Sequence, residues 1–343
     1  MKNKTPESVL IQTLLTSSIE SGKVENCKLS NLDQLAGDAS TRRYFRAETD
    51  CGTYVVCLDH PWEGKKEDYT FYEVQNFLIE NNVRVPAILD IDLKKGYLLE
   101  EDLGDQTFLK YMSEVKDEET EFVEYKKCLD LMTSYHNIDH RALEKKFLRR
   151  KFDLDKFMEE LEFTIKHFYS GFLKISPTKH EKMIIRDTLG EICKELARKK
   201  MVITHRDFHS RNIMVKNNEF ILIDFQDARL GIPQYDMVSL LEDCYYQISN
   251  KNLGKLKKYC FDNLSKHVDD QKTEEVFYYL YDLMLIQRVF KAVGTFSYIY
   301  SVRGNHRYLK YIGFAMEKIK LALMQRPHFS DLRKVLFKYY YEN

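Results

Sequence analysis

One stretch of ten residues limits the folds open to this chain more than any other feature of its sequence. It runs Ile203-Thr204-His205-Arg206-Asp207-Phe208-His209-Ser210-Arg211-Asn212 and fits the pattern H-R-D-x-x-x-x-N. Asp224 follows twelve residues after the asparagine, across two apolar runs separated by Asn217-Asn218. Asparagine tolerates the positive φ angles of a tight turn, so these runs predict a β-hairpin. We expect this hairpin to bring Asn212 and Asp224 together.

The side chains in this pattern are the ones that phosphoryl transfer requires. A carboxylate close to an acceptor hydroxyl can orient it and take its proton, which makes Asp207 the expected general base. Amide and carboxylate oxygens suit the hard Mg²⁺ ion that accompanies ATP, so we expect Asn212 and Asp224 to bind the metal. The alternative is that Asp207 caps a turn and the other two simply end the hairpin. Their combined spacing favours the catalytic interpretation.

Three further polar residues, one within this stretch and two beyond it, allow more than one role. Asp227 could hold a water molecule, an arginine or the acceptor hydroxyl. His205 is expected to be a buried histidine that pins the loop, in preference to a proton-transfer group. Asp236 could cap the next helix or fix the backbone of the loop.

The composition describes a folded protein without an overall charge bias. With 343 residues, 44% of them hydrophobic, the chain can bury a large core in two domains or two lobes. Lys+Arg and Asp+Glu both count 53, which gives no reason to expect a nucleic-acid partner. Neither a signal peptide nor a long apolar run is evident, so we expect a cytoplasmic protein with no membrane contact and no obligate protein partner.

Hydrophobic periodicity predicts an α+β architecture with a small β-rich lobe at residues 1–100 and a large, mainly helical lobe at residues 101–343. The first lobe would cover the nucleotide, and the second would carry the catalytic loop and the acceptor site. A polar, glycine-containing joint at residues 100–105 would connect them. Helices are expected at about residues 66–79, 116–137, 154–168, 180–198, 237–249, 256–267, 273–293, 307–324 and 331–341, and strands at about 44–46, 54–58, 83–91 and 97–99.

The segment Gly37 to Arg46 lies where a phosphate-covering turn is expected in the first lobe. Ser40 and Thr41 offer hydroxyls, and backbone N–H groups can bind anionic oxygens. The following strand, Tyr54 to Leu58, has no lysine to bind phosphate. We therefore expect Arg43 or Arg46 to supply that cation, because a guanidinium binds phosphate oxygens bidentately. The remaining residue expected at the nucleotide is Glu101; the alternative is a hairpin with surface arginines.

With these residues, the chain resembles the aminoglycoside phosphotransferase superfamily, whose two lobes clamp ATP as protein kinases do. The resemblance spans nearly the whole chain. Three blocks are similar to the anomeric sugar kinases of peptidoglycan recycling: residues 37–46, residues 224–228, and residues 287–288 with 291–296. The resemblance implies transfer of phosphate from Mg-ATP to C1 of N-acetylmuramate or N-acetylglucosamine, which yields a sugar 1-phosphate.

The acceptor is the part of this function that local charge would decide. N-acetylmuramate carries a lactyl carboxylate, whereas aminoglycosides are polycations, so the two need opposite pockets. Acceptors such as aminoglycosides, choline or another small alcohol would use the same catalytic residues. A non-catalytic binding module with a kinase shape is the alternative from a different class. The residues expected to contact the substrate are Asp227, Arg211, Arg288 and Lys291, with Arg303 and Arg307 as further basic candidates.

Overall fold

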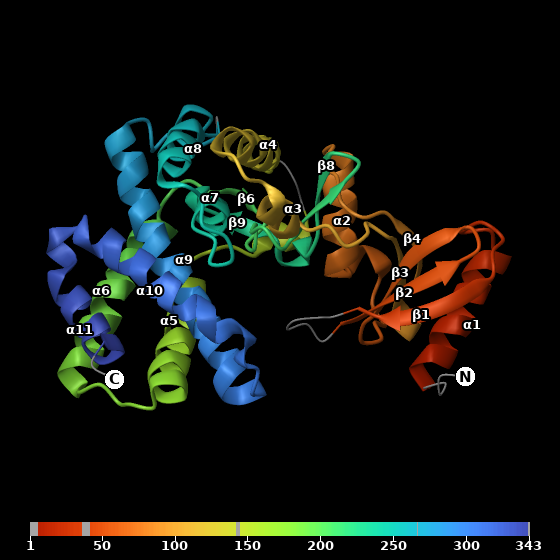
Figure 1. Ribbon diagram of the computed structural model, residues 1–343, viewed down its shortest axis with the longest axis horizontal. Helices are drawn as coiled ribbons and strands as arrows, with labels where there is room; N and C mark the ends of the chain where they lie inside the picture. The colour runs from red at the N-terminus through yellow and green to blue at the C-terminus, as the bar shows by residue number, and fades with distance from the viewer. Residues whose placement is uncertain (1–5, 36–41, 142–144, 266, 342–343) are drawn as a thin grey trace. The chain divides into compact units, whose positions relative to one another are not determined.

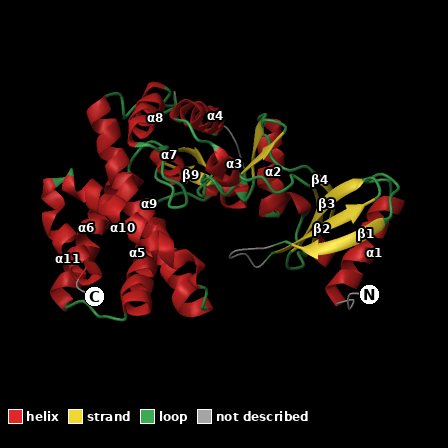
Figure 2. Ribbon diagram, viewed as in Figure 1, coloured by secondary structure: helices red, strands yellow, loops and turns green. Residues whose placement is uncertain are grey.

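The computed structural model describes residues 6–35, 42–141, 145–265 and 267–341, which fall into two compact units. One unit holds residues 1–106 and 214–226, and the other holds residues 107–213 and 227–343. Residues 214–226 group with the first unit because Val215 N–H donates to Gln106 O (2.8 Å) and Leu222 N–H donates to Arg84 O (3.1 Å). The first unit is built on a sheet and the second is mainly helical (Figure 2), which confirms the α+β prediction.

The first unit contains a five-stranded antiparallel sheet in the order β1-β2-β3-β5-β4. A separate hairpin, β7 and β8, turns at Asn217 and Asn218, whose φ angles are 53° and 63°. The predicted positive-φ turn is therefore confirmed. The elements are α1 (Pro6–Glu20), β1 (Leu29–Gln34), β2 (Arg43–Thr49), β3 (Gly52–Leu58), α2 (Thr70–Glu80), β4 (Ile88–Asp92), β5 (Tyr97–Glu101), β7 (Ile213–Lys216) and β8 (Glu219–Leu222).

The two faces of this sheet have different chemistry because side chains alternate along each strand. On one face, Phe45, Val56 and Leu99 pack with Leu14 and neighbouring residues of α1 in a buried core. Helix α1 lies against the sheet (Figure 1). The register pairs Tyr44 with Cys57 and Cys57 with Leu98, which places these three side chains on the opposite face. That second face also carries the buried carboxyl of Glu100 and is called the polar face below.

The second unit is organised around α9, a 30-residue helix whose middle is buried among α5, α6, α7 and α10 (Figure 1). At Gly294 a Cβ atom would lie 2.4 Å from Thr164 Oγ1, so α9 and α5 approach closely only because this residue is glycine. Its elements are α3 (Phe108–Glu114), α4 (Glu118–His136), α5 (Leu154–Ile165), a π-helical segment (Lys166–Leu173), α6 (Lys179–Ala197), β6 (Val202–Thr204), β9 (Arg229–Gly231), α7 (Gln234–Leu241), α8 (Asn250–Asp262), α9 (Glu274–Arg303), α10 (Leu309–Met324) and α11 (Ser330–Tyr341).

Several predicted boundaries were wrong, for local reasons. The strand expected at residues 83–91 is limited to β4, because Pro86 cannot donate a ladder hydrogen bond. The helix expected at 237–249 is α7, which ends at Leu241, and Asp243 beyond it accepts from Ser210. The next helix, α8, starts earlier than expected because Ser249 caps it through Asn252 N–H. Strand β1 and helix α3 were not predicted. Among the described residues, every helix is too short or too polar to span a membrane.

The buried Glu100 makes the stability of the chain depend on pH. Burial, only partly offset by Arg42, raises the pKa of Glu100 from 4.5 to about 7. Because this pKa is raised in the folded state, the contribution of Glu100 to the unfolding free energy is complete below pH 4.5 and is lost as the pH rises through 7. We expect Glu100→Gln to remove this loss, which is on the order of 3 kcal/mol. Urea unfolding of both proteins at pH 5 and pH 8 measures it; an equal difference in unfolding free energy at both values would contradict the prediction.

Candidate active site

The predicted catalytic loop connects β6 to β7, and a buried carboxylate holds its first residues. Asp236, at the start of α7, accepts from His205 N–H (2.7 Å) through Oδ2 and from Arg206 N–H (3.0 Å) through Oδ1. The ring of His136 lies 3.2 Å from Asp236 Oδ2. Arg206 has a φ of 82°, a conformation that non-glycine residues adopt at a cost. Asp236 therefore fixes the loop backbone, one of the two roles predicted for it, and His205 is fully buried as predicted.

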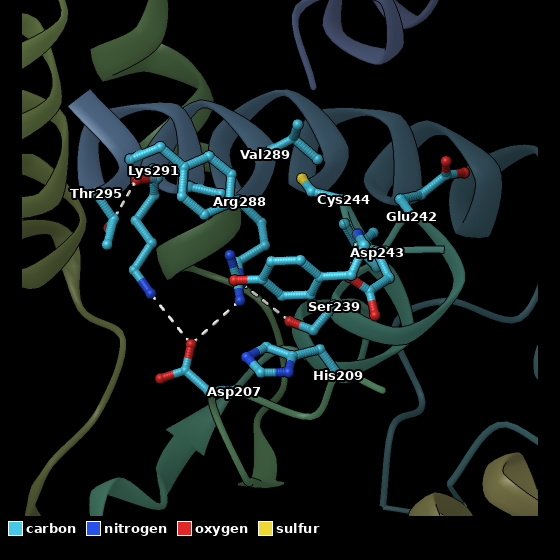
Figure 3. A pocket seen from close by; sticks show the side chains of 14 residues that line it. Asp207, His209, Ser239, Glu242, Asp243, Cys244, Arg288, Val289, Lys291 and Thr295 are labelled. Carbon is cyan, nitrogen blue, oxygen red and sulfur yellow. Dashed lines mark hydrogen bonds and ion pairs between the residues drawn. The ribbon is translucent and has the colours of Figure 1, made fainter. Parts of the chain in front are cut away.

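Asp207, the predicted base, faces two cations from α9. Arg288 Nη2 lies 3.1 Å and Lys291 Nζ 3.2 Å from the same oxygen, Asp207 Oδ1 (Figure 3). Positions 288 and 291 are three residues apart, so both side chains leave one face of the helix. Burial alone would raise the pKa of Asp207, but Lys291, Arg206 and Arg288 together hold it well below its usual value. Asp207 is thus ionised at any physiological pH.

The second half of the loop is fixed by its own hydrogen bonds. Asn212 Nδ2 donates to Asp207 O (3.0 Å), which turns the amide nitrogen toward the loop and the amide oxygen away from that carbonyl. Ser210 N–H donates to Asp243 Oδ2 (3.0 Å), and Ser210 Oγ bonds to the same oxygen. The bond from Nδ2 fixes the orientation of the Asn212 amide, whose oxygen is of the type that a hard cation binds.

A cavity of about 110 Å³ opens beside Asp207. Binding pockets that enclose a drug-sized ligand are several times larger, so this cavity admits only part of an acceptor molecule. His209 lies at its edge next to Asp207 (Figure 3), and burial lowers the pKa of His209 to about 3. A neutral imidazole at this position can exchange hydrogen bonds with a hydroxyl. The lining residues are Asp207, His209, Val238, Ser239, Glu242, Asp243, Cys244, Tyr245, Arg288, Val289, Lys291, Ala292, Thr295 and Phe296.

The carboxylates that line this cavity are compensated by neighbouring groups. Glu242 is paired with Lys257 (2.7 Å) and Lys318 (2.8 Å). Asp243 accepts from Ser210, and its burial raises its pKa. Among the described residues that line the cavity, the carboxylates are thus paired with cations or hydrogen-bonded, which weakens their attraction for a polycationic acceptor.

The other predicted substrate residues of the second unit have partners of their own. The Arg211 guanidinium lies over the rings of Tyr245 (4.9 Å) and Tyr308 (5.7 Å) and donates to Tyr308 Oη (3.1 Å). Asp227 pairs with Arg206 (2.9 Å), which matches one of the three roles considered for it. The further basic candidates Arg303 and Arg307 are exposed.

Two predicted site residues of the first unit, Asp224 and Glu101, have polar partners within that unit. Asp224 is exposed, has a φ of 62° and accepts from Gln226 Nε2 (2.7 Å). Glu101 accepts from Arg84 (2.6 Å) and Lys216 (3.1 Å). Asn212 belongs to the second unit, so its convergence with Asp224 on one metal ion stays a prediction.

Both arginines expected to replace the missing lysine are bound by acidic residues of the first unit. Arg43 is half-exposed and pairs with Glu7 of α1. Arg46 is bound by Asp102 (2.7 Å) and Asp105 (2.8 Å). Ser40 and Thr41 lie outside the described residues.

Several residues near the site were missed at the level of sequence. Asp243 and His209 were not singled out, although the former lies seven residues after Asp236 and the latter lies within the motif itself. Arg42, next to the two arginines that were singled out, was also missed. The alternation of β2 was the available signal, since residues 42, 44 and 46 share one face and residue 43 lies on the other.

Fold and site together define a kinase-like phosphotransferase. The aminoglycoside phosphotransferase APH(2'')-Ib, solved with ADP, superimposes with a TM-score of 0.57 at 18% identity, over 90% of this chain and 96% of its own. Choline kinase LicA from Streptococcus pneumoniae gives 0.60 at 14% identity, over 90% and 99%. At such identities the likeness concerns the fold, and it confirms the predicted kinase-like architecture.

Sequence comparison then identifies the family. The profile of the Phosphotransferase enzyme family matches residues 31–257, so the chain belongs to this family. The N-acetylmuramate/N-acetylglucosamine kinase of Neisseria meningitidis is 28% identical over 274 residues, 80% of each chain. The protein of the same name from Pseudomonas aeruginosa is 28% identical over 314 residues, 88% of this chain and 86% of its own. The chain is thus a phosphotransferase that acts on a hydroxyl, as the motif predicted.

The role of Asp236 can be tested with one isosteric change. In Asp236→Asn one oxygen becomes an NH₂ group that faces a backbone N–H of the loop. We expect a loss of about 1 to 3 kcal/mol in unfolding free energy and a roughly ten- to hundredfold lower kcat with little change in the nucleotide KM. The control is Asp117→Asn, since Asn caps a helix as well as Asp. Equal kcat values for the two variants would contradict this role.

Proposed function

We propose that this protein is an ATP-dependent kinase that phosphorylates the anomeric hydroxyl of N-acetylmuramate, N-acetylglucosamine or both, in the recycling of cell-wall sugars. The observation that carries the proposal is the ionised Asp207, held by Arg288 and Lys291 at a small cavity of the second unit. The names of the relatives from Neisseria and Pseudomonas support the same acceptor.

The chemistry of Asp207 suits an anomeric acceptor. Because neighbouring cations hold its pKa low, Asp207 is a weak base. An anomeric hydroxyl is more acidic than an ordinary alcohol, since the ring oxygen withdraws electrons from C1, and a weak base can therefore accept its proton. In a loose phosphoryl-transfer transition state, orientation of the hydroxyl matters more than base strength. Asp207 would thus orient the hydroxyl and take its proton as the phosphoryl group arrives.

Mg-ATP is the proposed phosphoryl donor. The oxygens of Asn212 and Asp224 are of the type that Mg²⁺ prefers, and each residue has an arrangement that fits the role: a fixed amide in one and an exposed carboxylate in the other. Bound magnesium would neutralise charge on the transferred phosphate. Nucleotide use is supported by the ADP in the solved aminoglycoside phosphotransferase. Ser40, Thr41 and Glu101 remain proposed contacts of the nucleotide.

The charges around the cavity favour a neutral or anionic acceptor. Lys291 and Arg288 line it and share one carboxylate, Asp207, while Glu242 is paired with two lysines and Asp243 accepts from Ser210. Arg211, which contacts two tyrosine rings, is the proposed contact for a substrate carboxylate, and Asp227 is the proposed contact for a hydroxyl. This distribution disfavours aminoglycosides and choline as acceptors.

The reaction can be tested by the position of the phosphate in the product. We expect ³¹P and ¹H NMR, after incubation with Mg-ATP and either sugar, to show a phosphate coupled to the anomeric proton. Asp207→Asn should lower kcat by on the order of 10² to 10⁴ because it removes the base. Retained ATP binding by the variant would show that it is folded. Phosphate on another hydroxyl, or turnover only with a different alcohol, would overturn the anomeric assignment; no turnover with any alcohol would favour a binding module.

The influence of Lys291 on the base predicts a change in the pH profile. Lys291 lowers the pKa of Asp207, so its removal raises that pKa. In Lys291→Met we expect the acid limb of log kcat against pH to move to higher pH, because the pKa of Asp207 rises. Lys334→Met, at a largely exposed lysine of α11, is the matched control and should keep the wild-type profile. A profile that falls uniformly, without a shift of its acid limb, would contradict this coupling.

A further inference from the structure

The strand that should present a phosphate-binding lysine presents none. In β3 the side chains on the polar face of the sheet include Val55 and Cys57. Burial raises the pKa of the Cys57 thiol above its usual range, so it is not an anion and carries no positive charge either. A kinase that binds ATP phosphates with this unit needs a cation from another position.

We propose that Arg42, anchored by Asp59, is the cation that binds the ATP phosphates in this protein. The inference rests on the proposed function, because it assumes that ATP is the donor. It replaces the expectation that Arg43 or Arg46 serves this purpose. The geometry of the first unit supplies the argument.

The direction of the Arg42 side chain is set by the strand that follows it. Arg42 precedes β2 and has the same parity as Tyr44, so it belongs to the polar face, opposite the core formed with α1. Arg43 has the other parity and reaches Glu7 on the α1 side. Arg46 shares the polar face, but Asp102 and Asp105 both bind it. Two carboxylates on one guanidinium leave little net charge for a phosphate.

Asp59 fixes the orientation of Arg42. Asp59 Oδ2 accepts from Arg42 Nε (2.8 Å) and from Tyr69 Oη (2.6 Å), while Oδ1 accepts from His60 N–H (2.7 Å). The guanidinium also lies over the Phe71 ring (5.2 Å), and its side chain is only 16% exposed. Since the bond to Asp59 uses Nε, one of five N–H donors, the anchor sets the plane in which the terminal nitrogens lie. A guanidinium that is already ordered loses less entropy on binding phosphate.

The surroundings of Arg42 connect it to the predicted metal ligand. Phe71 contacts Phe225, with ring centroids 5.0 Å apart, and Phe225 directly follows Asp224. Burial raises the pKa of Tyr44; among the charges near it, Arg42 lowers this pKa and Asp224 raises it. The cation and the metal-binding carboxylate therefore belong to one neighbourhood of the first unit. A phosphate chain held by magnesium at Asp224 would extend over this neighbourhood.

The arrangement corresponds in chemistry to the lysine–glutamate ion pair of protein kinases. There the lysine comes from β3 and the glutamate from the following helix. Here the cation comes from the start of β2 and the carboxylate from the end of β3, and α2 contributes Phe71 and the adjoining Tyr69. Both partners come from earlier positions in the chain than in protein kinases, while the ion pair and its order, cation before carboxylate, are kept. A purely structural pair, which only joins β2 to β3, is the competing explanation.

Binding of nucleotides that differ in their phosphates separates these explanations. Isothermal titration calorimetry would compare ATP with adenosine on wild type, Arg42→Ala and Arg42→Gln, the last of which can still donate a hydrogen bond to Asp59. We expect both variants to bind ATP about 10- to 100-fold more weakly, because a charged hydrogen bond is lost. Adenosine affinity should be unchanged. Arg141→Gln, which removes an exposed arginine–aspartate pair in the other unit, controls for loss of an ion pair.

The outcomes distinguish this inference from the function on which it rests. Wild type that binds no ATP would overturn the kinase proposal itself. The role of Arg42 alone would be overturned if both Arg42 variants bound ATP as tightly as wild type. It would also be overturned if Arg42→Gln lost ATP and adenosine binding equally. Arg43→Gln, tested in parallel, decides between the neighbouring arginines: a loss of ATP affinity there and not at Arg42 would restore the expectation from the sequence.

Discussion

The ion cluster of Asp207, Arg288 and Lys291 is the interaction on which the second unit depends. Two cations on one turn of a buried helix are costly to desolvate unless a carboxylate meets them. Asp207 provides it, and the loop can bring Asp207 there only because Asp236 binds the backbone of the two preceding residues. The helix α9 and the loop therefore hold each other in place. The same contact lowers the pKa of Asp207 and so keeps the proposed base ionised.

The first unit depends on a similar pairing of a buried cation with an anchored carboxylate. Arg42 directly precedes β2 and Asp59 directly follows β3; Phe71 of α2 lies against Arg42, and Tyr69, which precedes α2, donates to Asp59. In both units a charged side chain is ordered before any ligand binds, so less of the ordering cost falls on binding. This preorganisation is what phosphoryl transfer demands, because its catalysis consists mostly of positioning and electrostatic stabilisation.

Most of the architecture was predictable because its signals are local. The hairpin at Asn217-Asn218 and the long helices follow from residue spacing and turn chemistry. The errors arose where distant contacts set an element's end. Helix α7 stops where Asp243 turns to Ser210, and strand β1 exists only through its pairing with β2. Neither partner is visible from the segment itself.

The sequence by itself determined the chemistry: the order and spacing of Asp207, Asn212 and Asp224 identify a phosphotransferase, since these residues lie close in the chain and one hairpin separates them. Tertiary structure alone decided which cations lie beside the candidate base and which side of the sheet each arginine of the first unit occupies. Arg288 and Lys291 reach Asp207 across more than 80 positions, through the packing of α9. Arg42 differs from Arg43 only in the face of the sheet it occupies. Charged residues can be counted in a sequence, but the group that each charged side chain faces depends on the packing of the folded chain.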